Sequence, residues 1–231
     1  ANKVVEITRD GQLVETKLKP NPFENFKSGK PVSTDCYQVN NKQYGQCKEF
    51  YPNGKLSFFG EWDNGWLDGH CDYFYESGTK KATGEYKKGF KVGPWKYFDS
   101  TGILNAEENF VFRDKMGLKE GLFKYHYSSG KLKSTYNYKD DKIEGESYDY
   151  YESGNIKAKY FYKNGLAEGE ALLYHGTGSV KARCNYKNDK LDGTAAYYTE
   201  KGVVEKTSVH KNGDLVREKK EIISKTITAY L

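Results

Sequence analysis

Glycine recurs at a fixed spacing through most of this chain. Seven glycines lie 24 residues apart, with one interval of 28, and a second glycine follows each of them by nine residues. The first column is Gly45, Gly69, Gly93, Gly121, Gly145, Gly169 and Gly193, and the second is Gly54, Gly78, Gly102, Gly130, Gly154, Gly178 and Gly202. A constant period of this length is the signature of a repeat protein, in which each unit packs only on its neighbours.

The residues between the glycines predict one β-hairpin per repeat. In the repeat that begins at Gly145, two aromatic-rich runs flank Ser153-Gly154, a pair typical of a tight turn. A second turn, such as Asn164-Gly165, joins each repeat to the next and leaves no room for a helix. We therefore expect an all-β fold: an elongated array of antiparallel β-hairpins that forms one twisted, open sheet.

The same period divides the chain into three parts. We expect a degenerate N-terminal repeat or cap over 1–44, seven hairpin repeats over 45–216 and a C-terminal cap over 217–231. In the first part, the run from Thr34 to Val39 is expected to form the last strand of the degenerate repeat. In the last part, the β-branched run Glu221–Tyr230 is expected to form a capping strand.

Composition excludes several classes of protein. No stretch approaches the roughly 18 apolar residues that a membrane-spanning helix needs. The 36 aromatic residues (Tyr 21, Phe 12, Trp 3) are too many for a disordered chain. The net charge of +5, from 37 basic and 32 acidic residues, is small and not segregated, which makes a nucleic-acid partner improbable.

A strand register follows if each hairpin turns on two residues. A turn centred on Asn53-Gly54 places Cys47 opposite Gly60, and Phe50 opposite Ser57. Side chains alternate across a sheet, so one face is expected to be buried. Its columns are the aliphatic Leu56, Leu104, Leu132, Ile156, Val180 and Val204; the small Ala82, Ala106, Ala158 and Ala182; and the aromatic Trp62, Tyr86, Phe110, Tyr138, Tyr162 and Tyr186.

This register also suggests a role for the first glycine column. The aromatic column of each repeat is expected to lie opposite the glycine of the following strand, as Tyr162 opposite Gly169. A ring folded over a cross-strand glycine restores the packing that the glycine lacks. The glycine column would then be structural and would need no ligand.

The opposite face is expected to carry aromatic residues beside lysines. The pairs are Phe50–Ser57, Phe74–Lys81, Phe98–Asn105, His126–Lys133, Tyr150–Lys157, Tyr174–Lys181 and Tyr198–Glu205. One interpretation is that lysine stems cover the rings while their ammonium groups stay solvated. The other is a linear platform for a partner. Its candidate binding residues are Phe74, Lys81, Lys133, Tyr150, Lys157, Tyr174, Lys181 and Arg183.

The repeat resembles the bacterial variant of the MORN repeat, whose unit reads roughly G-x-x-x-x-Y-Y-x-x-G-x-L followed by a Tyr-x-x-Asn-Gly turn. The resemblance covers about 170 of the 231 residues, with the best matches at 145–168 and 69–92. Asp99, His175 and Thr199 depart from it by replacing the second tyrosine of the pair. The resemblance implies a hairpin array that acts as an interaction or membrane-associated module, and one bacterial branch carries an antitoxin label.

Nothing in the sequence indicates an enzyme, so we expect no catalytic residues and no cofactor. The motifs of serine hydrolases, phosphate-binding loops and zinc proteases are absent. Asp140 and Asp141 lie in a predicted turn, where carboxylates are solvated. The four histidines lie in different repeat columns and no Cys-x-x-Cys occurs, so no metal site is expected either.

Cysteine positions favour one disulfide. Cys47 and Cys71 occupy the same place in successive repeats, about 9.6 Å apart, which is too far for a bond. The register sets Cys36 opposite Cys47 on the adjacent strand. If a bridge forms, it is the bridge between these two, and Cys184 is expected to be free.

Two functional hypotheses follow. In the first, the chain is a non-enzymatic scaffold at the bacterial envelope or outside the cell, and its partner is another protein, an extended anionic or glycan surface, or a membrane surface. In the second, it is a cytoplasmic, antitoxin-like protein that binds and neutralises a toxin. The first is favoured by the Met-free start at Ala1 and by the potential Cys36–Cys47 bridge.

Overall fold

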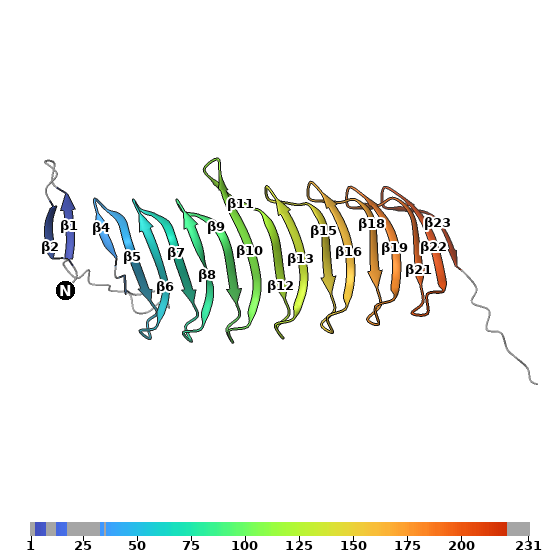
Figure 1. The fold of residues 1–231 in the computed structure, drawn as a ribbon, viewed down its shortest axis with the longest axis horizontal. Helices are drawn as coiled ribbons and strands as arrows, with labels where there is room; N and C mark the ends of the chain where they lie inside the picture. Colours follow the sequence, from blue (N-terminus) through green and yellow to red (C-terminus); the bar gives the residue numbers. More distant parts are fainter. Residues whose placement is uncertain (1–2, 8–12, 18–32, 35, 221–231) are drawn as a thin grey trace, which may run out of the picture. The chain divides into compact units, whose positions relative to one another are not determined.

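The computed structural model describes residues 3–7, 13–17, 33–34 and 36–220. Every regular element in these ranges is a β-strand, and successive strands are joined as antiparallel hairpins (Figure 1). No helix in the described part of the chain is long and apolar enough to cross a membrane. The predicted all-β class and hairpin array are confirmed.

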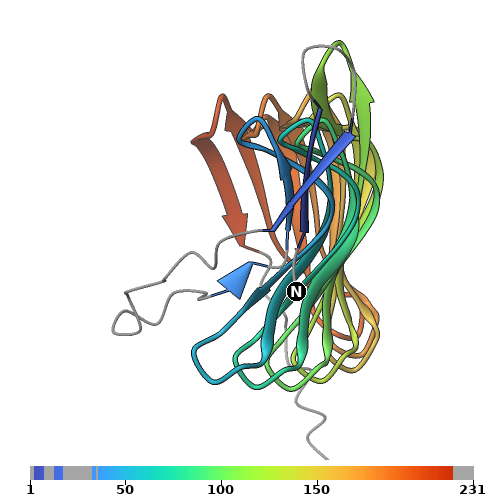
Figure 2. The same ribbon diagram turned by 90° about the vertical axis from the view of Figure 1, so that its left-hand side faces the viewer.

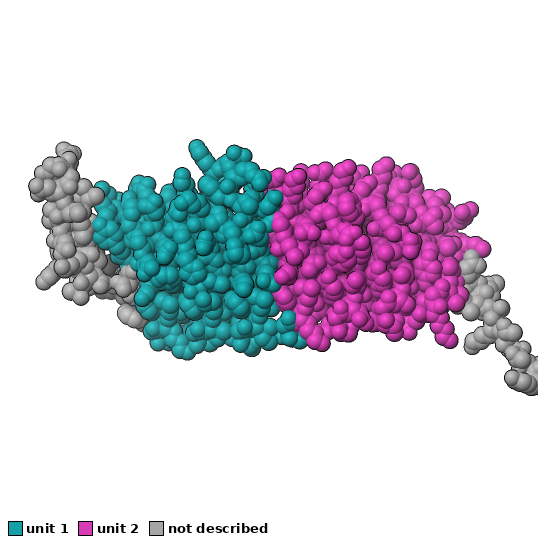
Figure 3. All heavy atoms as spheres, viewed as in Figure 1, with its two compact units in different colours: residues 1–120, 128–130 teal, residues 121–127, 131–231 magenta. Residues whose placement is uncertain are grey.

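The chain divides into two compact units, coloured teal and magenta in Figure 3. Unit 1 contains residues 1–120 and 128–130. Its strands are β1 (Lys3–Ile7), β2 (Leu13–Lys17), β3 (Ser33–Thr34), β4 (Tyr37–Val39), β5 (Lys42–Phe50), β6 (Leu56–Asp63), β7 (Trp66–Phe74), β8 (Lys80–Lys87), β9 (Phe90–Phe98), β10 (Leu104–Arg113) and β11 (Met116–Lys119). Strands β1 and β2 form a separate two-stranded sheet, whereas β3 and β4 both pair with β5.

Unit 2 contains residues 121–127 and 131–231. Its strands are β12 (Gly121–His126), β13 (Leu132–Lys139), β14 (Lys142–Ile143), β15 (Gly145–Tyr150), β16 (Ile156–Lys163), β17 (Leu166–Ala167), β18 (Gly169–Tyr174), β19 (Val180–Lys187), β20 (Lys190–Leu191), β21 (Gly193–Tyr198), β22 (Val204–Lys211) and β23 (Asp214–Lys220). Within each unit, each strand pairs with the next strand along the chain or, across a short link strand, with the one after it, as β13 pairs with both β14 and β15, so each sheet is open. The strands are bent, as Figure 2 shows end-on.

The end regions differ in detail from expectation. In place of the single strand expected from Thr34 to Val39, the structure has two short strands, β3 and β4. The last described strand, β23, pairs with β22 and crosses the boundary expected between 216 and 217. The capping strand expected over Glu221–Tyr230 lies outside the described residues.

The hairpin tips are longer than the expected two-residue turns. The amide of Tyr51 donates to the carbonyl of Lys55, and the amide of Gly54 donates to the carbonyl of Tyr51. We call this five-residue segment a tip turn. It shifts the register by one residue, so that Phe50 lies opposite Leu56 rather than Ser57, while Cys47 still lies opposite Gly60 as predicted. The same shift recurs at the tip of each later hairpin.

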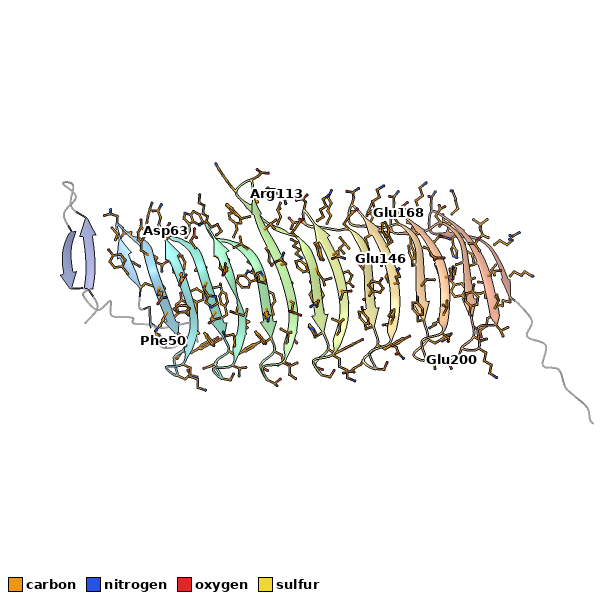
Figure 4. The ribbon with its side chains drawn as sticks, viewed as in Figure 1. Phe50, Asp63, Arg113, Glu146, Glu168 and Glu200 are labelled. Atoms are coloured by element: carbon orange, nitrogen blue, oxygen red, sulfur yellow. A yellow bond between two sulfur atoms is a disulfide. The ribbon has the colours of Figure 1, made fainter. Side chains whose placement is uncertain are left out.

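The turns between repeats follow the prediction. Asn164 and Gly165 both have positive φ, of 54° and 87°, and Lys163 pairs with Leu166 across them. These are the dihedrals of a two-residue type I′ hairpin, for which Asn-Gly is the favoured sequence. We call these segments link turns. In Figure 4, Asp63 marks the link edge of unit 1, and Glu168 and Glu200 mark the link and tip edges of unit 2.

One face of each sheet is buried, and its predicted alanine column is confirmed. Ala82, Ala106, Ala158 and Ala182 are at most 8% exposed, and the aromatic column beside them is half-buried. The aliphatic column lies at the shifted tip and is half-buried, except for Ile156, which is 36% exposed. The most buried column is one that the sequence analysis missed, two residues after each first-column glycine. It is Cys47, Cys71, Trp95, Phe123, Ser147, Ala171 and Ala195, none more than 1% exposed.

The first glycine column has a different cause from the one expected. Tyr162 lies opposite Gly145 of its own hairpin and opposite Ala167 of the following strand, not opposite Gly169. Gly169 has a φ of +74°, and no atom lies within 4 Å of the point where a side-chain carbon would stand. The register slips by two residues here, and glycine supplies the left-handed backbone. Rings do cover glycines elsewhere, as Trp95 covers Gly84.

Hydrogen bonds along both edges join successive repeats. At the tips, the Tyr151 hydroxyl donates to the carbonyl of Tyr174, 23 residues later, at 2.7 Å. The same bond recurs in Tyr51, Tyr75 and Tyr127, and His175 places its Nε2 2.9 Å from the carbonyl of Tyr198. At the link edge, carboxylates that precede first-column glycines accept from link-turn amides, as Glu144 does from Asn164 at 2.8 Å. Glu168 and Asp192 do the same for Asn188 and Asn212.

Removing one of these tyrosine hydroxyls should have a measurable cost. We expect Tyr151→Phe to lower the free energy of unfolding by about 1 kcal/mol, because the half-buried carbonyl of Tyr174 loses its donor. Urea unfolding followed by circular dichroism measures the change. Tyr160→Phe is the control, since no hydrogen bond of its hydroxyl occurs among the described residues. Equal losses in the two variants would show that the inter-repeat bond adds nothing.

Candidate functional site

The tip shift changes the predicted pairs of aromatic residues and lysines. Phe74 lies opposite Lys80 rather than Lys81, and His126 opposite Leu132 rather than Lys133. Tyr150 and Tyr174 lie opposite Ile156 and Val180. The expected pairing is therefore wrong by one residue. The cause is the longer tip turn, which leaves each of these lysines as the extra residue of a bulge.

The lysines still contact rings, although not the expected ones. The Nζ of Lys81 lies 5.6 Å from the ring centre of Tyr75, and that of Lys133 lies 5.8 Å from the ring centre of Tyr127. These tyrosines are the tip residues that donate to the next repeat. Each lysine stem thus covers part of a structural tyrosine.

Three equivalent lysines of unit 2 form what we call the lysine row: Lys133, Lys157 and Lys181. All three are exposed. None has a carboxylate within ion-pairing distance in the described part of the chain. Since they recur once per hairpin, two strand spacings separate neighbours by about 9.6 Å. The row is a regular line of uncompensated positive charge.

Arg183 does not belong to this row. Its Nη1 lies 2.9 Å from Glu170 Oε1 across the outer face of the sheet, so its charge is locally balanced. Lys159 is similarly paired with Glu146, which Figure 4 labels near the middle of the strands. Both ion pairs are largely exposed, so each contributes little to stability.

Two other predicted binding residues, Phe74 and Lys81, lie in unit 1. They help to line a hollow of about 350 Å³ between the first two hairpins. We call it the aromatic hollow, and its other lining residues are Glu49, Tyr51, Ser57, Phe58, Trp62, Leu67 and Tyr73. The rings of Phe58 and Tyr73 lie 5.0 Å apart, and burial raises the pKa of the Glu49 carboxyl.

The cysteines have no features of nucleophiles. Cys71 and Cys184 are free and buried. Burial raises the pKa of the Cys71 thiol to about 12, and it also raises that of Cys184. A thiol of this kind stays protonated and unreactive near neutral pH. No cluster of metal-ligating side chains occurs among the described residues.

Cys36 and Cys47 are joined by a disulfide bond, which is the pair that the sequence analysis named. The local register explains it, because Thr34 lies opposite Glu49 and the same register sets Cys36 opposite Cys47. The bond connects the segment before β4 to β5 of the first hairpin.

Two features were not predicted from the sequence: the column of acidic residues that precede first-column glycines, and the aromatic hollow. Both had a signal in the repeats. An acidic residue precedes the first-column glycine in five repeats, at Asp68, Glu120, Glu144, Glu168 and Asp192. At the hollow, the first repeat departs from its successors at several positions. A position-by-position comparison of the repeats would have shown both.

Comparison with known proteins identifies the repeat. Residues 43–58, 91–111, 119–140, 143–164 and 167–188 match the MORN repeat variant family. No curated protein sequence matches the chain.

Solved structures are only distantly similar. A GtfA/B complex bound to UDP and GlcNAc matches 56% of this chain at 15% identity and a TM-score of 0.21, and the match covers 22% of that chain. A porin-like protein from Bacteroides uniformis matches 75% of this chain and 86% of its own length, at 10% identity and a TM-score of 0.23. Neither similarity is close enough to support an argument about fold or function.

Proposed function

Because the chain carries repeats of the MORN variant family between residues 43 and 188, we propose that it is a non-enzymatic binding scaffold whose lysine row engages an extended anionic partner. The observation that supports this is that the row has no ion pairs at the tip edge in the described structure, although other cations of unit 2 do have them. Lys159, Arg183, Lys206 and Lys211 are all paired with carboxylates. Lys133, Lys157 and Lys181 are not, and they stand at the same position in successive hairpins.

The spacing of the row selects the kind of partner. A single exposed charge contributes less than about 1 kcal/mol, so one lysine alone gives no useful affinity. Three charges on one sheet edge act together only on a partner whose negative charges extend along the array. An acidic polysaccharide or another polyanionic chain has this property. A protein with an acidic strip is the other candidate.

We place this activity at the bacterial envelope or outside the cell. The Cys36–Cys47 disulfide supports that location, since such bonds persist in oxidising compartments and are rare in the cytosol. A cytoplasmic role is the alternative.

Charge reversal of the row tests the proposal. We expect K133E/K157E/K181E to weaken binding to immobilised heparin, used as a model acidic polysaccharide, by at least tenfold at low salt. Binding of the native chain should also fall steeply as salt is added. The circular dichroism spectrum should not change, because all three side chains are exposed.

A second triple variant provides the matched control. Lys139, Lys163 and Lys187 are also exposed and recur once per repeat of unit 2, but they lie at the link edge. K139E/K163E/K187E therefore makes the same change in net charge away from the row. We expect it to lose less than threefold in affinity. If the two triple variants lose equal affinity, the loss comes from the change in net charge, and a site at the tip edge is refuted.

A further inference from the structure

Four residues that line the aromatic hollow differ from the residue that is most common at the same position of the other repeats. Glu49 stands where four other repeats have tyrosine, one has Asp149 and one has Leu173, and Ser57 stands where four have lysine. Phe58 replaces an alanine, and Trp62 replaces a tyrosine. The equivalent residues are Tyr73, Tyr97, Tyr125 and Tyr197 for Glu49; Lys81, Lys133, Lys157 and Lys181 for Ser57; Ala82, Ala106, Ala158 and Ala182 for Phe58; and Tyr86, Tyr138, Tyr162 and Tyr186 for Trp62.

Two polar groups of the hollow are unsatisfied. Ser57 is 7% exposed, and its hydroxyl has no hydrogen-bond partner in the described structure. The indole N–H of Trp62 is also buried without a partner. Most buried polar groups in proteins are hydrogen-bonded, so an unpaired donor and an unpaired hydroxyl in one lining call for a ligand with oxygen acceptors.

The charges of the hollow argue against a simple ion. Glu49 is half-buried and makes no ion pair or hydrogen bond within the described residues, so it repels an anion. Lys81 lines the same hollow and repels a cation. A neutral ligand that donates to the carboxylate and accepts from the Trp62 N–H and the Ser57 hydroxyl is compatible with both charges.

The aromatic walls of the hollow require a ligand that also has apolar faces. The rings of Tyr51, Phe58, Trp62, Tyr73 and Phe74 surround the polar groups, and the volume of about 350 Å³ is that of a small-molecule site. A pyranose ring combines C–H faces that stack on aromatic rings with hydroxyls that both donate and accept. We propose that the aromatic hollow binds a neutral sugar ring. This site is in unit 1 and is independent of the lysine row.

Titration of the ¹⁵N-labelled full chain with N-acetylglucosamine, glucose and galactose tests the proposal. The indole N–H of Trp62, assigned by its loss in Trp62→Phe, is expected to shift saturably with at least one of these sugars in the millimolar range. The indole signal of Trp66, whose side chain is exposed outside the hollow, is expected to stay in place. Tetramethylammonium chloride and sodium phosphate are the charged probes and should not shift Trp62.

Two variants that each introduce a lysine at the same repeat position locate the site. Ser57→Lys restores the residue of the other repeats and should weaken sugar binding at least tenfold. Asn105→Lys makes the equivalent change in the third repeat, outside the hollow, and should leave binding within twofold. Glu49→Tyr, which again restores the common residue, should weaken binding as Ser57→Lys does. The proposal is overturned if no sugar shifts Trp62, if only a charged probe does, or if Ser57→Lys and Asn105→Lys behave alike.

Discussion

Replacing Trp95 by alanine is expected to lower the free energy of unfolding by about 3–5 kcal/mol. Trp95 is 1% exposed, and its indole N–H donates to the carbonyl of Glu85 at 3.1 Å. Its ring lies 5.0 Å from that of Tyr86 and 6.0 Å from that of Tyr97. Alanine would leave a cavity among these rings and an unpaired carbonyl. Gly84 cannot fill the space, because it has no side chain.

Urea unfolding monitored by circular dichroism measures this loss, and Trp66→Ala is the control. Trp66 lies at a link turn and is 59% exposed, so its replacement should change the free energy of unfolding by less than about 1 kcal/mol. A similar loss in both variants would mean that the buried column of unit 1 is not its main source of stability.

Gly169→Val should be the second strongly destabilising change, with a loss of about 2 kcal/mol in the free energy of unfolding. The reason is the backbone and not a collision, because φ is +74° and no atom lies near the position of a side chain. A left-handed conformation costs an L-residue roughly 1–2 kcal/mol, and β-branching makes it worse.

A comparison of asparagine with valine at position 169 separates backbone strain from a side-chain clash. Asparagine adopts left-handed conformations more readily than other residues, so Gly169→Asn should be clearly milder than Gly169→Val in the same urea experiment. Lys157→Ala, on the exposed row, should change stability by less than about 0.5 kcal/mol. If asparagine is as destabilising as valine, a clash explains the glycine and the observed register is wrong.

Much of the fold follows from the period of the sequence. The spacing of the glycines predicts the number of hairpins, and alternation along the strands predicts which face carries Ala82 and Ala158. Link turns such as Asn164-Gly165 are recognisable because their dihedrals require those residue types. The opposition of Cys36 and Cys47 follows from the same strand alternation.

The tip turns and the bulges could not be predicted in this way. Ser153-Gly154 suits a two-residue turn as well as the longer turn observed, and the difference is one residue of register. That residue decides whether Lys133 contacts His126 or Tyr127. The two-residue slip at Gly169 depends on both neighbouring strands at once, so no pattern within one strand reveals it.

The candidate sites were also predictable only in part. Exposure of Lys133, Lys157 and Lys181 was predictable from their repeat position, whereas the pairing of Arg183 with Glu170 depends on the actual cross-strand geometry. The aromatic hollow required comparing the first repeat with the others. Its residues Glu49 and Ser57 are ordinary singly and become informative only once the fold brings them together.

The inter-repeat hydrogen bonds give the array a polarity. The tyrosine hydroxyls at the tips point to the following repeat, and so do the carboxylates of Glu144, Glu168 and Asp192 at the link edge. In such an array, a tyrosine at the last tip would have a hydroxyl donor with no following repeat, and this donor could bond to another copy of the chain. The last tip turn among the described residues has Thr199 in place of tyrosine, and the threonine hydroxyl accepts from the amide of Val203 in its own turn. This tip turn therefore presents no tyrosine hydroxyl to a neighbouring repeat, as is also the case at Asp99, whose carboxylate accepts from the amides of Thr101 and Ile103 in its own turn.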